Sequence, residues 1–168
     1  MTSQQLSTLT IADAEIMHQL GLRLAGLLRA GDLLILTGPL GAGKTTLSRG
    51  IGEGLGVVGT VSSPTFVIAR THKRTDGGPE LVHVDAYRLA SPQELDDLDI
   101  DFAKSITLIE WGKGFTDGIS DSWLDIAIDR DRTGATEVRM VSITGHGPRW
   151  DSSWEFFRSQ LTSDGFGQ

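Results

Sequence analysis

Short apolar runs along the chain predict the strands of a buried sheet. Residues 32–37 and 106–110 are almost unbroken in hydrophobic character, which is typical of strands covered on both faces. Residues 65–71 and 80–85 also have strand character, and the turn-forming residues 76–79 between them predict a hairpin. These four segments are expected to form the centre of the fold.

Helical spacing marks the segments between the strands. Over residues 10–30 apolar side chains recur every three or four positions, and Thr10 suits the helix cap while Gly31 suits the helix end. Residues 44–56 have the same helical character. Residues 91–98 begin with Ser-Pro-Gln-Glu, which favours a helix start because the serine and the glutamate can cap each other's backbone groups.

The last third of the chain predicts an antiparallel pair and an aromatic tail. Residues 123–129 and 136–143 alternate apolar and polar positions on either side of an Arg-Thr-Gly turn. In the tail, residues 145–168, aromatic side chains recur at helical spacing, which favours packing into the core over binding a partner. The aromatic stripe consists of Trp150, Trp154 and Phe157. No repeat or linker divides the chain, so we expect one α/β domain over residues 1–168, with a mixed parallel and antiparallel sheet flanked by helices.

Composition and charge narrow the class of protein. The 168 residues carry 15 Lys and Arg against 22 Asp and Glu, and this net charge of −7 is unsuited to coating nucleic acid. The absence of cysteine excludes disulfides and thiolate metal sites. No apolar run reaches the length of about 18 residues that a membrane span needs, and the first residues lack the features of a secretory signal. We therefore expect a cytoplasmic protein without a membrane partner.

A glycine-rich turn after the first apolar run carries the strongest functional signal. Residues 38–45 read Gly-Pro-Leu-Gly-Ala-Gly-Lys-Thr and match G-x-x-x-x-G-K-[ST] at each defined position. In this motif the glycines let backbone N–H groups point at a phosphate, Lys44 reaches the phosphate oxygens and Thr45 supplies a hydroxyl to Mg²⁺. A strand before the turn and a helix after it favour a P-loop over an incidental turn. The loop residues expected to bind the nucleotide are Gly38, Leu40, Gly41, Ala42, Gly43, Lys44, Thr45 and Thr46.

Two acids at the ends of predicted strands complete the expected metal site. Asp85 and Glu110 each end an apolar run, at the position where open α/β sheets bind ligands, and with Thr45 they form the expected set of Mg²⁺ ligands. Ala86 follows Asp85, where many fast ATPases have a glutamate base, so we expect slow hydrolysis that a partner completes. His83 alternates with valines on the same strand, and we expect it to be a structural residue of the sheet and not a ligand.

Four segments in order give the chain a resemblance to a known family. The first segment is the phosphate loop, residues 38–46, with Ser-Arg-Gly at 48–50 behind it. The other three are Ser-Pro-Thr-Phe at 63–66, His-Val-Asp-Ala-Tyr-Arg-Leu at 83–89 and Ile-Glu-Trp at 109–111. At these spacings the segments resemble the TsaE family, the bacterial ATPases of tRNA threonylcarbamoyladenosine biosynthesis, over about residues 10–145. The phosphate loop alone is generic, whereas the later segments are much more specific.

The resemblance implies a cofactor, partners and residue roles. It implies binding of ATP or ADP with Mg²⁺, slow hydrolysis, and action with TsaD and TsaB in forming the threonylcarbamoyl group on adenosine 37 of ANN-decoding tRNAs. TsaD carries the transfer site, so tRNA would be met only through the complex. By resemblance Lys44, Asp85 and Glu110 serve hydrolysis, Thr65 approaches the γ-phosphate, and Trp111 lies beside the nucleotide.

Two other functions are compatible with a phosphate loop. A small-molecule or nucleotide kinase would need an arginine-rich lid over a second substrate, and the sequence has no lid of that kind. A regulatory module that senses ATP and ADP without turnover differs from an ATPase only in rate. The guanine-reading N-K-x-D motif is absent, which favours ATP over GTP.

The basic hairpin tip at 72–74 and the acidic run at 96–101 are expected to be solvated.

Overall fold

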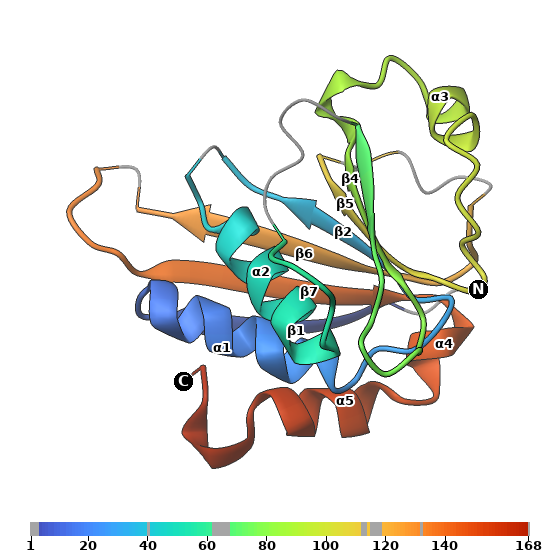
Figure 1. Ribbon diagram of the computed structural model, residues 1–168. Coiled ribbons are helices and arrows are strands. Elements are labelled where there is room, and N and C mark those ends of the chain that lie inside the picture. Colours follow the sequence, from blue (N-terminus) through green and yellow to red (C-terminus); the bar gives the residue numbers. More distant parts are fainter. Residues whose placement is uncertain are drawn as a thin grey trace.

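A seven-stranded sheet forms the centre of the molecule, with helices on its faces (Figure 1). The computed structural model describes residues 4–39, 41–61, 68–111, 114, 119–131 and 133–167. The first elements are β1 (Gln4–Ile11), α1 (Ala14–Ala25), β2 (Leu33–Thr37), α2 (Lys44–Leu55), β3 (Ala69–His72), β4 (Leu81–Asp85) and η1 (Ala86–Arg88). They are followed by α3 (Pro92–Asp96), β5 (Ile106–Glu110), β6 (Trp123–Arg130), β7 (Arg139–His146), α4 (Pro148–Asp151), α5 (Trp154–Leu161) and η2 (Ser163–Gly165).

The sheet is mixed, with a parallel centre and antiparallel flanks. Its strand order is β1-β7-β6-β2-β5-β4-β3. Strands β4, β5, β2 and β6 run parallel, whereas β3, β7 and β1 run antiparallel to their neighbours. The predicted α/β fold with a mixed sheet is confirmed, as are the pairing of β3 with β4 and that of β6 with β7. The carboxyl ends of the four parallel strands lie at one edge, where the functional loops begin.

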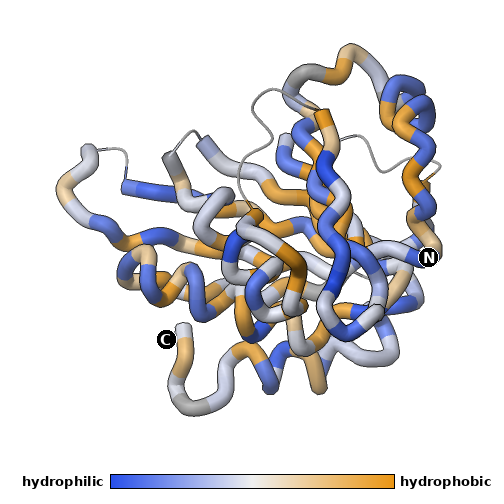
Figure 2. The backbone as a smooth tube through the Cα atoms, in the orientation of Figure 1, coloured by the Kyte–Doolittle hydropathy of each residue, from blue (hydrophilic) through white to orange (hydrophobic). Residues whose placement is uncertain are grey.

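Alternating side chains divide the core between the two faces of the sheet. Leu34 and Leu36 of β2 pack in the larger cluster with residues of α1, α2 and α5. Leu33 and Ile35 of the same strand pack on the other face, against the segment around α3. Figure 2 shows hydrophobic residues gathered along the central strands, between these covering layers. Burial on both faces explains why β2 and β5 are almost unbroken apolar runs.

Helices α1 and α2 approach each other closely through glycine. A Cβ atom on Gly21 would stand 2.6 Å from the carbonyl oxygen of Leu47 and 2.7 Å from the backbone nitrogen of Ile51. A Cβ on Gly50 would collide with the carbonyl oxygen of His18. Because only glycine permits this approach, α1 holds α2, and with it the loop that precedes α2, against the sheet.

The N-terminal strand β1 was not expected from the sequence. Residues 4–11 pair with β7 along its whole length, and only one face of β1 is buried, through Ser7, Leu9 and Ile11. The predicted helix over 10–30 is therefore shorter, spanning Ala14–Ala25, and its cap is Asp13, whose carboxylate accepts a hydrogen bond from the Ile16 N–H at 2.9 Å. Leu27 and Leu28 continue the helical spacing of apolar residues beyond Ala25 and pack against the core, but they lie after the end of the helix.

Three other elements differ from the prediction by more than one residue at an end. The strand expected at 136–143 is β7 at Arg139–His146, and the helix expected at 91–98 is α3 at Pro92–Asp96. The described part of the strand expected at 65–71 is β3, from Ala69, while residues 65–67 lie outside the described residues. In each case the element type is as predicted, and only its ends move.

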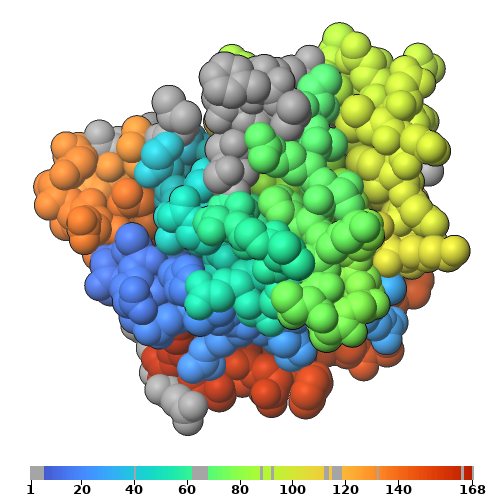
Figure 3. All heavy atoms as spheres, viewed as in Figure 1, coloured from blue at the N-terminus to red at the C-terminus, as the bar shows by residue number. Residues whose placement is uncertain are grey.

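The C-terminal segment packs onto the larger core cluster. Trp150, Trp154 and Phe157 are buried, as their helical spacing predicts. In Figure 3 this segment (red) lies beneath α1 (blue). Arg149 secures it, because its guanidinium bonds both carboxylate oxygens of the buried Asp32, at 3.0 and 3.2 Å. None of the helices in the described ranges is long and apolar enough to cross a membrane.

Candidate nucleotide-binding site

The glycine-rich loop connects the carboxyl end of β2 to the first turn of α2. Gly41 and Gly43 adopt positive φ angles of 77° and 115°, which L side chains rarely permit, so the turn depends on glycine at both positions. Helix α2 has no side-chain cap and no acidic residue in its first turn. Its first N–H groups therefore have no capping partner of that kind, which is the arrangement that binds anions. Leu40 lies outside the described residues.

Lys44 is the first residue of α2, and its side chain folds back over the loop. It is only 6% exposed, and Nζ donates hydrogen bonds to the carbonyl oxygens of Gly38 at 2.7 Å and Pro39 at 3.0 Å. Burial lowers the pKa of Lys44 below its ordinary value, and the nearby carboxylates of Glu110 and Asp85 oppose this shift. No ion pair joins Lys44 to either acid in the described part of the chain, so the cation and the carboxylates remain separate.

The two predicted acids are brought together by strand register. Asp85 ends β4 and Glu110 ends β5, and the two residues are directly paired across these parallel strands. Asp85 is partly exposed, and its Oδ1 accepts a hydrogen bond from the Tyr87 N–H at 3.0 Å. Glu110 is 4% exposed, and its Oε2 lies 3.0 Å from Nε2 of His83. Neighbouring parallel strands that end at one level thus place two carboxyl groups at one edge of the sheet.

Trp111 follows Glu110 and closes one side of the site. Its φ angle of +63° is unusual for a residue with a side chain and carries a strain of about 1–3 kcal/mol. The Trp111 N–H donates to the carbonyl oxygen of Leu36 at 3.0 Å, which ties this turn to β2. The ammonium of Lys44 stands 4.2 Å from the centre of the indole ring, and the exposed ring of Tyr87 lies 5.6 Å from the indole.

These parts surround one pocket, and every described residue that lines it belongs to the predicted site. The lining consists of Gly41, Gly43, Lys44, Thr45, Thr46, Asp85, Glu110 and Trp111. Of the other predicted residues, the Gly38 carbonyl oxygen accepts a hydrogen bond from Lys44, and Ala42 lines a neighbouring cavity. Thr65 and Leu40 lie outside the described residues, so their roles stay predictions.

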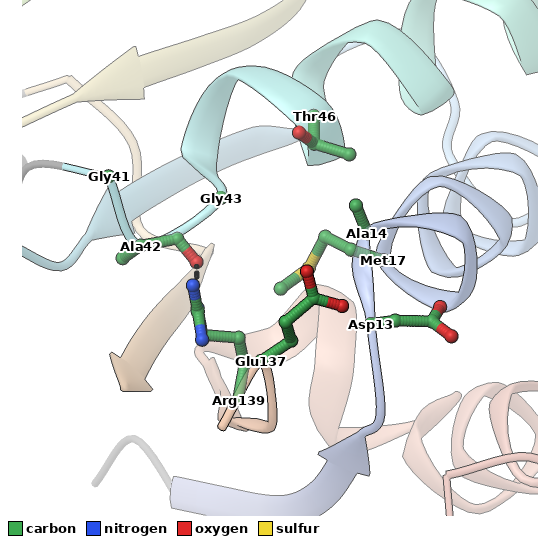
Figure 4. A pocket seen from close by; sticks show the side chains of 9 residues that line it. All are labelled: Asp13, Ala14, Met17, Gly41, Ala42, Gly43, Thr46, Glu137 and Arg139. Atoms are coloured by element: carbon green, nitrogen blue, oxygen red, sulfur yellow. Dashed lines mark hydrogen bonds between the residues drawn. The ribbon is translucent and has the colours of Figure 1, made fainter. Parts of the chain in front are cut away.

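A second cavity adjoins the loop from the side of α1 (Figure 4). It is lined by Asp13, Ala14, Met17, Gly41, Ala42, Gly43, Thr46, Glu137 and Arg139. Arg139 Nε donates a hydrogen bond to the carbonyl oxygen of Ala42 at 3.1 Å, drawn as a dashed line in Figure 4. Because Gly41, Gly43 and Thr46 line both pockets, the two pockets meet over the loop.

Sequence reasoning missed the residues that this second cavity adds to the site. The sequence places Asp13 within the predicted helix over 10–30 and Arg139 within the predicted strand over 136–143. No local motif marks either residue. They approach the loop because β1 leads into α1 on one side and β7 begins beside it on the other, which is a consequence of the sheet order.

The fold and this loop define the class of the protein as a P-loop NTPase-like α/β protein. The family described as Threonylcarbamoyl adenosine biosynthesis protein TsaE matches residues 11–139 of the chain. The chain therefore belongs to the TsaE family.

Relatives of known name cover most of the chain. The tRNA threonylcarbamoyladenosine biosynthesis protein TsaE of Streptomyces coelicolor is 56% identical over 138 residues, which is 80% of this chain and 93% of that protein. The proteins of that name from Mycobacterium tuberculosis and Bacillus subtilis are 42% and 35% identical, over 78% and 76% of this chain and 83% and 78% of their own lengths. The crystal structure of YdiB from Bacillus subtilis has a TM-score of 0.71 at 28% identity, covering 94% of this chain and 96% of that one.

Proposed function

We propose that the chain binds ATP with Mg²⁺ in the phosphate pocket and hydrolyses it in the service of tRNA threonylcarbamoyladenosine biosynthesis. One observation carries the proposal, namely that a lysine, a threonine and two carboxylates from three separate segments face one pocket at the N-terminus of α2. A structural role would bring the lysine into an ion pair with an acid. Instead Lys44 bonds the loop carbonyls of Gly38 and Pro39, which supports a site prepared for an anion.

The phosphates would be bound by the loop and by Lys44. N–H groups at the start of α2 and the positive end of the helix dipole stabilise negative charge there. The Lys44 ammonium already stands at the loop, and a phosphate oxygen would replace the carbonyl oxygens as its acceptor. Because the pocket buries this lysine, its charge is screened less than it would be in water, so its attraction for a phosphate is stronger.

The residues present also fit Mg²⁺ when phosphate shares the binding. Mg²⁺ prefers oxygen ligands and is commonly bound by one or two carboxylates together with substrate phosphates. Thr45, Asp85 and Glu110 supply a hydroxyl and two carboxylates around the pocket. In the described residues no group of three or more His, Asp or Glu could hold a metal alone, so the binding would depend on the nucleotide. When bound there, Mg²⁺ would neutralise charge that develops on the phosphate oxygens.

The second cavity would receive the nucleoside. Neither Asp85 nor Glu110 is in its lining, and Ala14 and Met17 give it an apolar wall (Figure 4). Glu137 and Arg139 add a carboxylate and a guanidinium to its lining, which suits the polar edges of a ribose and a base. Asp13 also lines the cavity, and its Oδ1 accepts the hydrogen bond from the Ile16 N–H that caps α1. A nucleotide lying across the loop would then fill both pockets at once.

The biological role is proposed from the names of the relatives. The curated relatives are named for tRNA threonylcarbamoyladenosine biosynthesis. We propose that this chain acts in the same pathway, with the TsaD and TsaB partners that the family resemblance implies. The chain itself would hydrolyse ATP and leave the threonylcarbamoyl transfer on adenosine 37 to its partners. Ala86 after Asp85 leaves that position without a carboxylate base, which supports slow hydrolysis in the absence of partners.

The decisive experiment measures Mg²⁺-dependent release of phosphate from ATP by the chain alone and with TsaD and TsaB. We expect slow release alone, faster release with the pair, and loss of activity in Lys44→Ala. Glu110→Gln should lower turnover by about 10²- to 10⁴-fold, the contribution usual for a group that orients or deprotonates the attacking water. Glu155→Gln, an exposed acid on α5, is the control and should behave as wild type.

The same experiment separates the alternative functions. A kinase would transfer the labelled γ-phosphate to an added small-molecule or nucleotide acceptor. A sensor without turnover would bind ATP and release no phosphate under any condition. If the pair of partners leaves the rate unchanged while ATP still binds, the proposal of a partner-activated ATPase is wrong.

A further inference from the structure

A histidine buried beneath the site contacts one of the two acids. His83 lies in β4, and its side chain is 0% exposed. Its Nε2 lies 3.0 Å from Oε2 of Glu110, whose side chain is 5% exposed. Burying a polar side chain is unfavourable unless a hydrogen bond compensates for the lost water, so this contact accounts for a histidine among the apolar residues that precede Asp85 in β4.

The position of His83 keeps it away from the nucleotide. His83 pairs in register with Leu108, two residues before Glu110 on β5. Side chains two apart along a strand share a face, so His83 lies on the same face as Glu110 and one step further from the carboxyl edge of the sheet. His83 is absent from the lining of both pockets. It can therefore reach the reaction only through Glu110.

The direction of this hydrogen bond depends on the tautomer of His83, and the chemistry of the two groups favours one of the two. An ionised carboxylate only accepts, so the Nε2–H of His83 donates to Glu110 Oε2. Nδ1 of His83 is buried and has no partner among the residues that the structure describes. With the proton on Nε2, only the acceptor Nδ1 is buried without a partner. With the proton on Nδ1, the lone pair of Nε2 would face the carboxylate of Glu110 and the Nδ1–H would be buried without a partner, which is less favourable.

We infer that His83 is a positioning residue, which holds Glu110 through Oε2 so that Oε1 is presented to the pocket. The inference rests on the proposed function, because it assigns Glu110 a task in hydrolysis. No hydrogen bond to Oε1 occurs among the described residues, whereas Oε2 is held from below. The final torsion of a glutamate side chain is otherwise broad, and misplacing a reacting group by about 1 Å can reduce the rate 10²-fold.

Three substitutions separate positioning from packing. His83→Gln can keep an N–H donor near the position of Nε2, whereas His83→Asn carries the same amide on a shorter side chain, near the position of Nδ1. His83→Leu keeps apolar volume and has no donor. We expect turnover of ATP to fall by about 10- to 100-fold in the leucine and asparagine variants, the usual effect of removing a residue that orients a ligand, and to recover in the glutamine variant.

Nucleotide affinity provides the contrasting measurement. Because His83 lines neither pocket, the dissociation constant for ADP, measured by calorimetry below the onset of unfolding, should stay at the wild-type value in all three variants. A fall in turnover with unchanged affinity, restored by glutamine, supports positioning. Equal turnover in the leucine variant and wild type overturns the inference, and so does parallel loss of affinity and turnover in all three variants.

A spectroscopic measurement tests the contact without any turnover. In ¹⁵N NMR spectra of the nucleotide-free protein, the imidazole signals lost in His83→Gln belong to His83. We expect a protonated Nε2 and an unprotonated Nδ1. The opposite tautomer would overturn the inference and leave the proposed ATPase untouched. The expected tautomer in a protein that releases no phosphate even with its partners would instead refute the proposed function, and the assigned role with it.

Discussion

The buried ion pair between Arg149 and Asp32 yields a sharp prediction for stability. Asp32, just before β2, has a side chain that is 3% exposed, and Arg149, in α4, is 15% exposed. Besides its two bonds to Asp32, the guanidinium donates to the carbonyl oxygen of Leu27 at 3.2 Å and to Ser153 Oγ at 2.9 Å. Arg149→Met removes all four bonds and leaves a buried carboxylate without its cation.

The size of the effect follows from this burial. Removing one partner of a buried ion pair destabilises a protein by about 3–5 kcal/mol. In a chain of this length each kcal/mol lowers the melting temperature by about 2–4 °C, so the variant should melt about 6–20 °C below wild type. The matched control is Arg158→Met, which breaks an exposed pair with Glu155 and should change stability by about 0–1 kcal/mol.

The assay is urea unfolding followed by circular dichroism, with thermal melting as a second measurement. The double variant Asp32→Leu with Arg149→Met should recover most of the loss, because it removes the unpaired charge as well as its partner. If Arg149→Met is no less stable than Arg158→Met, the ion pair does not hold the C-terminal segment to the core, and the reasoning is refuted.

Further predictions concern the loop and its supports. Burial lowers the pKa of Lys44, so Lys44 should lose its proton, and the nucleotide affinity should fall, at a pH below the ordinary lysine value of 10.5. Over the same pH interval the contribution of Lys44 to the free energy of unfolding should rise, because the unfolded chain then binds the proton more tightly than the folded one. Lys44→Arg should shift the loss of affinity to higher pH. Trp111→Phe should remove most of the change in tryptophan emission on adding ADP, and an undiminished change would place the responding indole elsewhere. Gly21→Ala should destabilise by about 1–3 kcal/mol because its Cβ meets backbone of α2, whereas Gly26→Ala, with its nearest contact at 3.6 Å, should be close to neutral in the same unfolding assay.

The central strands and the phosphate loop could be predicted from the sequence because short stretches of neighbouring residues specify them. The buried strands β2 and β5 are nearly unbroken apolar runs, and the glycine pattern between β2 and α2 depends on backbone angles that only a few residues allow. Strand β1 was not predicted because only one of its faces is buried. Its sequence therefore shows only the alternation of the buried residues Ser7, Leu9 and Ile11 with exposed ones, which is a weaker pattern than an unbroken apolar run. Its strand conformation depends on pairing with β7, which lies more than 120 residues later in the chain.

The sequence by itself determined the phosphate loop and the two acids, because each is encoded within a few neighbouring residues, and the order of such local signals along the chain determined the α/β class and the resemblance to the TsaE family. Only the tertiary structure decided that Asp85 and Glu110 lie side by side, that Arg139 contacts the loop at Ala42, and that His83 Nε2 lies 3.0 Å from Glu110 Oε2. These contacts join segments between 25 and 97 positions apart. Strand order and register set such distances, and both depend on how the whole sheet buries its two faces.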